Sequence, residues 1–129
     1  MNKITALLTA LLLTVSAARA DFYSDNNPAD VWINALNPSY TGEFTLAGYD
    51  PVAQTITSAY AEFTFWDLVA GESIKIDLSG DLLTHGSFSG WLPLSVGIVN
   101  AWVTLDTTGA LSYTVSRNDN SVLSEFWLK

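Results

Sequence analysis

Carboxylates are plentiful among the residues of this chain that could do chemistry. The sequence holds 13 acidic residues, one histidine and no cysteine. Glu62, Asp67, Glu72 and Asp77 lie close together in sequence, and a glycoside hydrolase uses two carboxylates that face each other across a cleft. A chain of this length offers little room for such a cleft. We therefore expect no enzyme, and keep a small hydrolase as the last of three alternatives.

The single histidine, His85, is the only side chain whose ordinary pKa lies near neutrality. It precedes Gly86 in a stretch that has the composition of a turn, which favours a solvated loop residue. No serine stands in a G-x-S-x-G elbow. The sequence therefore does not indicate a nucleophile with its general base.

Metal binding has weak support. With one histidine and no cysteine, a zinc site of His/Cys type is excluded. Clustered Asp and Asn oxygens could bind calcium, either at 25–27 with Asp30 or at 118–120, but both stretches are ordinary turn compositions. We expect no cofactor, with calcium as the open alternative.

The five tryptophans are more informative than the acids. In each segment that resembles a strand, alternation places the tryptophan on the more polar side. Trp66 shares its side with Glu62 and Thr64, and Trp102 shares its side with Asn100 and Thr104. We therefore expect Trp66 and Trp102 to be exposed on one sheet.

Exposed indole rings beside polar groups can stack on the apolar face of a sugar or on the apolar patch of a partner. A tryptophan can also simply cover its neighbours on an outer face, and a one-residue bulge would reverse the parity. The candidate ligand-binding residues are Trp32, Trp66, Trp102, Glu62 and Asn100.

The segments that carry these residues read as short strands separated by turns. The longest runs from Thr55 to Trp66, after the turn Gly48-Tyr49-Asp50-Pro51. No amphipathic helix of useful length is indicated. The pattern predicts an all-β fold, an antiparallel β-sandwich (jelly-roll-like or Ig-like) of seven to eight short strands, with a closed barrel as competitor. The other expected strands are 31–36, 41–47, 72–78, 82–83, 98–105, 110–116 and 122–128, with 86–97 as an edge strand or a long loop.

Alternation within these strands also predicts the core. Residues on the apolar side of each run should be buried between the sheets. The expected core residues are Phe63, Phe65, Ile74, Ile76, Val99, Val103 and Val115.

Residues 1–20 have the features of a secretory signal peptide. Lys3 precedes an apolar run over 4–15, and Ala18-Arg19-Ala20 fits a peptidase site. An uncleaved N-terminal anchor is the alternative, although the run is short for a membrane span. We assign 1–20 to the signal peptide and 21–129 to a single domain, secreted to the extracellular space or the periplasm.

Cleavage is testable. Because Ala18 and Ala20 fit the small-residue pockets of the peptidase, N-terminal sequencing of the exported protein should begin at Asp21. A start at Met1 in the extracellular fraction would contradict the assignment.

Removing the signal peptide makes the domain strongly acidic. The whole chain carries a net charge of −8, and Lys3 and Arg19 leave with the signal. Three basic residues then stand against 13 acidic ones, a net charge of −10. Such a surface repels nucleic acid and anionic membranes, and no later segment is apolar enough to span a bilayer.

Several segments together resemble a known group of proteins. These are SYTGEFTL, the turn GYDP followed by TITSA and an aromatic strand, then DTTGALSYTV and a final FWL. They are similar to the small exported β-sandwich domains of PEP-CTERM-type bacterial surface proteins. The resemblance implies a sandwich fold with no catalytic residues to carry over.

Two features depart from that group. No sorting tail follows Lys129, which we take to indicate release rather than anchoring. Gly42 also stands where a polar residue would be expected.

Three functions follow in order of preference. The first is a non-enzymatic domain that acts by binding or assembly at the cell surface or in the extracellular matrix. The alternative is a carbohydrate-binding module that uses exposed tryptophans, and the second alternative is the small hydrolase. Coplanar, exposed tryptophan rings on one face would favour the carbohydrate-binding module.

Overall fold

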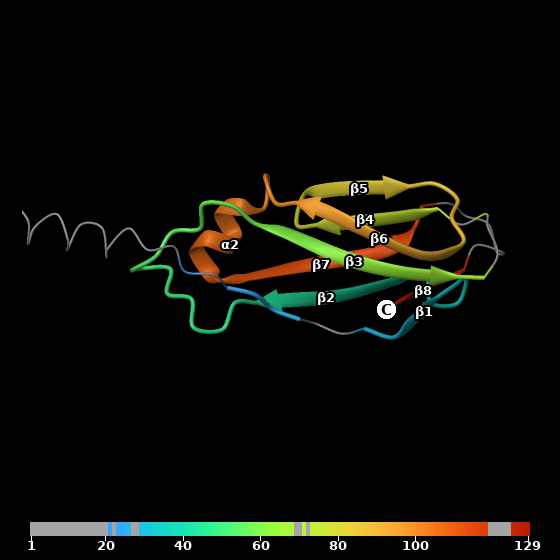
Figure 1. Cartoon of the computed structure of the whole chain (residues 1–129), viewed down its shortest axis with the longest axis horizontal. Coiled ribbons are helices and arrows are strands. Elements are labelled where there is room, and N and C mark those ends of the chain that lie inside the picture. The colour runs from blue at the N-terminus through green and yellow to red at the C-terminus, as the bar shows by residue number, and fades with distance from the viewer. Residues whose placement is uncertain (1–20, 22, 27–28, 69–70, 72, 119–124) are drawn as a thin grey trace, which may run out of the picture.

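The computed structural model describes residues 21, 23–26, 29–68, 71, 73–118 and 125–129. Within these residues, two four-stranded antiparallel sheets pack face to face (Figure 1). This confirms the all-β sandwich. The first, the β3 sheet, has the order β1 (Val31–Ile33), β8 (Phe126–Leu128), β3 (Tyr60–Asp67), β6 (Gly90–Gly97). The second, the β7 sheet, has the order β2 (Ser39–Thr45), β7 (Ala110–Arg117), β4 (Ile74–Leu78), β5 (Asp81–His85).

The core lies between the inner faces of the two sheets. Alternate residues of β3, β4 and β7 point inward, since their burial follows a period of two. The sequence prediction is confirmed for five of the seven expected core residues. Those buried are Phe63, Phe65, Ile74, Ile76 and Val115.

The prediction is wrong for Val99 and Val103, which are 75% and 62% exposed. The expected strand over 98–105 does not form. Instead, a turn leads into the short helix α2 (Trp102–Thr108), which ends at Gly109 in the left-handed conformation with φ 68°.

The turn before α2 is held by Asp81 of β5. Its carboxylate accepts hydrogen bonds from the backbone N–H groups of Val99 (2.9 Å), Asn100 (2.8 Å) and Ala101 (3.0 Å). Burial alone would raise the pKa of Asp81, but these N–H groups outweigh it and hold the pKa below its usual 3.8. Asp81, about 20 positions earlier in the sequence, thus stabilises a turn where the sequence predicts a strand.

Helix α2 also shortens the longest expected strand. Ile56 donates its N–H to Asp106 Oδ1 (2.7 Å) and accepts a hydrogen bond from Trp102 Nε1 (3.0 Å). Both backbone groups of Ile56 are therefore occupied by α2, and β3 begins only at Tyr60. Helix α2 closes the end of the sandwich opposite β1 and β8 (Figure 1).

The segment between β2 and β3 is fastened to the same helix. Asp50 Oδ1 accepts the N–H of Val52 at 2.9 Å, so this turn forms as expected. The Tyr49 hydroxyl donates to Asp106 Oδ1 at 2.7 Å. Partial burial, with the hydrogen bond and the charge of Asp106, raises the pKa of Tyr49 to about 12. The Ile56 N–H and the Tyr49 hydroxyl lower the pKa of Asp106.

The outer strands and turns are close to expectation. Ser79 (φ 51°) and Gly80 (φ 108°) form the tight turn between β4 and β5. The segment 86–97 contains the edge strand β6, where Pro93 pairs with Thr64. The N–H that Pro93 lacks would face the free edge, so the β3–β6 ladder keeps its bonds.

The structure gives a physical reason for glycine at position 42. It lies opposite Tyr113 across the β2–β7 pair. A Cβ at this position would fall 2.8 Å from Tyr113 Cε1, inside contact distance. Glycine therefore lets the Tyr113 ring lie directly on β2.

Among the residues described, no helix is long and apolar enough to cross a membrane.

Candidate functional site

Four of the five tryptophans form one row across the β3 sheet. The strand register pairs Trp32 with Trp127, Trp127 with Trp66, and Trp66 with Trp91. The row therefore crosses β1, β8, β3 and β6 in spatial order. With neighbouring strands about 4.8 Å apart, its length is roughly 14 Å. We call these four residues the tryptophan row.

The row lies on the outer face because its sequence neighbours fill the core. Ile33, Phe65, Phe126 and Leu128 are buried, and each precedes or follows a row tryptophan. Adjacent residues of a strand point to opposite faces. Trp32 and Trp66 therefore lie on the outer face of the sheet, the face on which strand parity in the sequence places them.

The rings pack on each other at an angle. Trp32 and Trp127 have ring centroids 4.9 Å apart with planes tilted by 52°, and Trp66 and Trp91 are 6.5 Å apart with a tilt of 57°. Trp91 is 65% exposed, while the other three are half-buried. The pairs are not coplanar, so they do not form the flat platform that would favour a carbohydrate-binding module.

A cation covers part of one half of the row. Lys129 Nζ lies 4.5 Å from the centroid of the Trp127 ring, within range of a cation–π contact. The same ammonium group pairs with Asp30 Oδ1 at 2.7 Å. This contact leaves the Trp66–Trp91 half as the more accessible half of the row.

Polar residues continue from the accessible half along β3 and β6. Thr64 and Glu62 share the outer face of β3 with Trp66, and Glu62 is exposed. Ser95 of β6 lies opposite Glu62. Aromatic rings beside hydroxyl and carboxylate groups give this face both apolar and hydrogen-bonding contacts.

Trp102 and Asn100 do not belong to this face. Trp102 is the first residue of α2, and its indole nitrogen bonds to Ile56 as described above. Asn100 donates its side-chain amide to Gly80 O at 3.3 Å. The expectation that Trp102 shares a sheet with Trp66 is wrong, because 98–105 is not a strand. Of the five candidate residues, the structure brings together Trp32, Trp66 and Glu62.

Trp91 and Trp127 complete the row, although the candidate set omitted them. Their parity is the same as that of Trp66. The missing information was the strand order, because the C-terminal strand β8 lies between β1 and β3.

The acidic residues are dispersed. Glu62 and Asp77 lie on the outer faces of different sheets, since both alternate with core residues. Asp67 is buried at the end of β3 and accepts the Leu68 N–H at 2.7 Å. Glu72 lies outside the described residues. The described part of the grouping therefore does not form a pair across one cleft.

Two of the possible calcium ligands have other partners. Asp25 Oδ2 accepts the backbone N–H of Thr45 at 2.8 Å, and Asp30 pairs with Lys129. Asn27, Asp119 and Asn120 lie outside the described residues. Among those described, no three His, Asp or Glu side chains are grouped to hold a metal ion.

His85 ends β5 and is half-buried rather than a free loop residue. One ring nitrogen, Nδ1, lies 2.8 Å from Gly86 O. Its ring lies edge-on to Phe88, with centroids 6.4 Å apart.

The fold and the row together define a β-sandwich with an aromatic outer face. No protein-family model matches the chain, and no curated protein matches it significantly.

Proposed function

We propose that this protein is an exported, non-enzymatic β-sandwich that acts by binding or assembly at the cell surface or in the extracellular matrix. The observation that carries the proposal is the tryptophan row. Its four indole rings lie in register, one on each strand of the β3 sheet. They lie on the outer face, so they are not part of the core between the sheets.

The energetic argument concerns the accessible half of the row. Binding energy is concentrated in a few aromatic residues that become desolvated on contact. Trp91 exposes most of its surface before binding, and it packs beside Trp66, which a rigid strand holds in place. Little side-chain entropy is then lost on binding, which favours affinity.

The tilt between rings bears on the kind of partner. Sugars stack best on rings that lie in one plane. An apolar protein surface that is uneven can instead fit rings tilted by more than 50°. The tilts therefore favour a protein partner. A carbohydrate partner is the alternative outcome of the test below.

Dispersed carboxylates support the non-enzymatic reading. A hydrolase would need two of them across one cleft, and Glu62 and Asp77 lie on opposite sides of the sandwich. Export is supported by the leader-like residues 1–20, which lie outside the described residues. The resemblance to PEP-CTERM-type surface domains is consistent with the same location.

Binding of the labelled protein to cells of the organism that carries the gene tests the proposal. Trp91→Ala should weaken cell binding about tenfold or more, the effect of losing one interface hot spot. Leu82→Ala is the matched control, because it removes an exposed apolar side chain from the other sheet, and it should leave binding unchanged.

Treatment of the cells separates the partners. Loss of binding after protease treatment supports a protein partner, and loss after periodate oxidation supports a carbohydrate. Equal binding by wild type and Trp91→Ala would contradict the proposal.

A further inference from the structure

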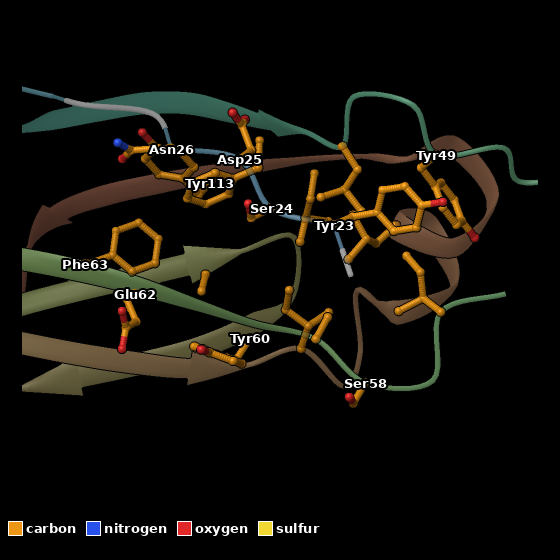
Figure 2. Close-up of a pocket in the computed structure, with 18 of the residues that line it drawn as sticks. Tyr23, Ser24, Asp25, Asn26, Tyr49, Ser58, Tyr60, Glu62, Phe63 and Tyr113 are labelled. Carbon is orange, nitrogen blue, oxygen red and sulfur yellow. The ribbon is translucent and has the colours of Figure 1, made fainter. Parts of the chain in front are cut away.

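The sandwich has an open groove between β2 and the first half of β3. Its volume is about 1100 Å³. Phe63 and Tyr113 are in edge contact in its floor, with ring centroids 5.1 Å apart, and Asp25 lies at its rim (Figure 2). Apolar side chains form the floor of the groove, chiefly Phe44, Leu46, Ile56, Phe63, Leu111 and Tyr113.

The groove exists because β8 covers only one half of β3. Pairing between these strands is limited to Phe65 with Leu128 and Trp66 with Trp127. The last hydrogen bond between them runs from Lys129 N–H to Thr64 O, at 2.9 Å. From Tyr60 to Phe63, no described strand lies on that side of β3.

Backbone polar groups of β3 therefore face the groove. Thr64 O points toward β8, and the alternation of a strand gives Glu62 and Tyr60 the same direction. Ala59 O points the other way, since it accepts the Ile98 N–H at 3.1 Å. Within the described residues, the N–H and C=O of Glu62 on this edge have no hydrogen-bond partner. An unpaired strand edge is a template for another strand.

The N-terminal segment does not fill this edge. Asp25 bonds to Thr45 of β2, and Gln54 Nε2 contacts Asp21 at 3.2 Å and also the Tyr23 hydroxyl. In the described residues, this segment makes no hydrogen bond to β3. It forms the far wall of the groove and leaves the edge of β3 open.

We propose that the open edge of β3 binds an extended segment of a partner protein, which adds a strand in line with β8. We call this site the strand lane, defined by Tyr60 to Phe63. At about 3.3 Å per residue its length is roughly 13 Å, enough for a four-residue segment. Alternate side chains of that segment would enter the groove over Phe63 and Ala61, and the others would face solvent.

The acidic residues around the groove indicate the charge of its partner. Asp21, Asp25 and Glu62 line the groove, and among the described residues that line it the one basic side chain, Lys129, is paired with Asp30. A segment that alternates apolar residues with Lys or Arg fits both the floor and the rim. A second copy of this chain is disfavoured because each copy carries a net charge of −8, or −10 after removal of the signal peptide. The strand lane is distinct from the tryptophan row, which lies on the outer face of the sheet.

Fluorescence anisotropy with a labelled seven-residue peptide, alternating Lys and Val and beginning with Lys, tests the strand lane on the exported protein. Glu62→Pro removes the open-edge N–H without removing a β3–β6 bond, as Pro93 does on β6. It should weaken peptide binding about tenfold beyond Glu62→Ala, which keeps the N–H; one backbone hydrogen bond accounts for that factor. Glu62→Ala itself should weaken binding only about threefold, by losing one charge.

Peptide variants keep the test independent of protein folding. Two further versions of this peptide carry N-methyl groups on alternate amides, one on the odd-numbered residues and one on the even-numbered residues. One of the two versions should lose binding at least tenfold. Replacing its Lys residues by Glu should abolish binding, and Trp91→Ala should leave the affinity for the original peptide unchanged.

The inference is overturned if the wild-type protein does not bind the Lys–Val peptide. It is also overturned if both N-methylated forms bind as tightly as the original, or if Glu62→Pro binds like Glu62→Ala. Binding of the Glu peptide with equal affinity would overturn the choice of a basic partner.

Discussion

Replacing Phe63 by Ala is expected to lower the free energy of unfolding by about 3–5 kcal/mol, the range for a large-to-small change in a core. Phe63 is buried and makes edge contacts with Phe44 and Tyr113, with ring centroids 6.0 and 5.1 Å apart. These rings come from both sheets, so the change opens a cavity where the sheets meet. Urea unfolding of the exported protein measures the loss.

Tyr60→Ala is the matched control. Tyr60 belongs to the same strand but is 66% exposed, and its loss should change stability by less than about 0.5 kcal/mol. A Phe63→Ala loss below about 1 kcal/mol, well under the expected core range, would mean that the faces of β3 are assigned wrongly.

Asp81→Ala is expected to cost about 2–4 kcal/mol, because a carboxylate that accepts three backbone hydrogen bonds is removed. Val99 and Asn100 are exposed, so water can reach their N–H groups, but Ala101 is buried and its N–H would be left unpaired. The turn before α2 should loosen first, which amide hydrogen exchange of α2 would detect. An unchanged exchange rate in α2 would contradict this role of Asp81.

The contribution of Asp81 should depend on pH in one direction. Its folded pKa lies below the unfolded value of 3.8, so the ionised form is favoured by folding. The stability it adds is fully present above the unfolded pKa and is lost as the pH falls toward the folded pKa. The gap in unfolding free energy between wild type and Asp81→Asn should therefore be constant near neutrality and shrink below about pH 4, the unfolded value for Asp. A gap that widens on acidification would contradict the assignment.

Most of the sandwich could be predicted because strand alternation is a local property. In β3 and β4, aromatic or β-branched residues alternate with polar ones, and the buried residues are those that the pattern indicates. The error over 98–105 has a non-local cause. Val99, Ala101 and Val103 alternate like a strand, but the carboxylate of Asp81 captures three backbone N–H groups of the segment.

The candidate site was predictable in part for the same reason. Parity alone put Trp32 and Trp66 on an outer face, since each is adjacent in sequence to a core residue. That the row is continuous depends on β8 lying between β1 and β3. Pairing of strands so distant in sequence leaves no local signal, so neither the row nor the strand lane could be derived from the sequence.

Oxidative footprinting of the wild-type protein tests the tryptophan row most directly. Free protein and protein bound to cells are exposed to hydroxyl radicals, and oxidation of each tryptophan is measured by mass spectrometry. We predict that Trp91, the most exposed ring of the row, is oxidised several times more slowly in the bound protein, because a hot-spot ring is desolvated on binding. Trp102, the first residue of α2, whose indole N–H donates to Ile56 O, should be unchanged. Equal oxidation of Trp91 in free and bound protein would contradict the account.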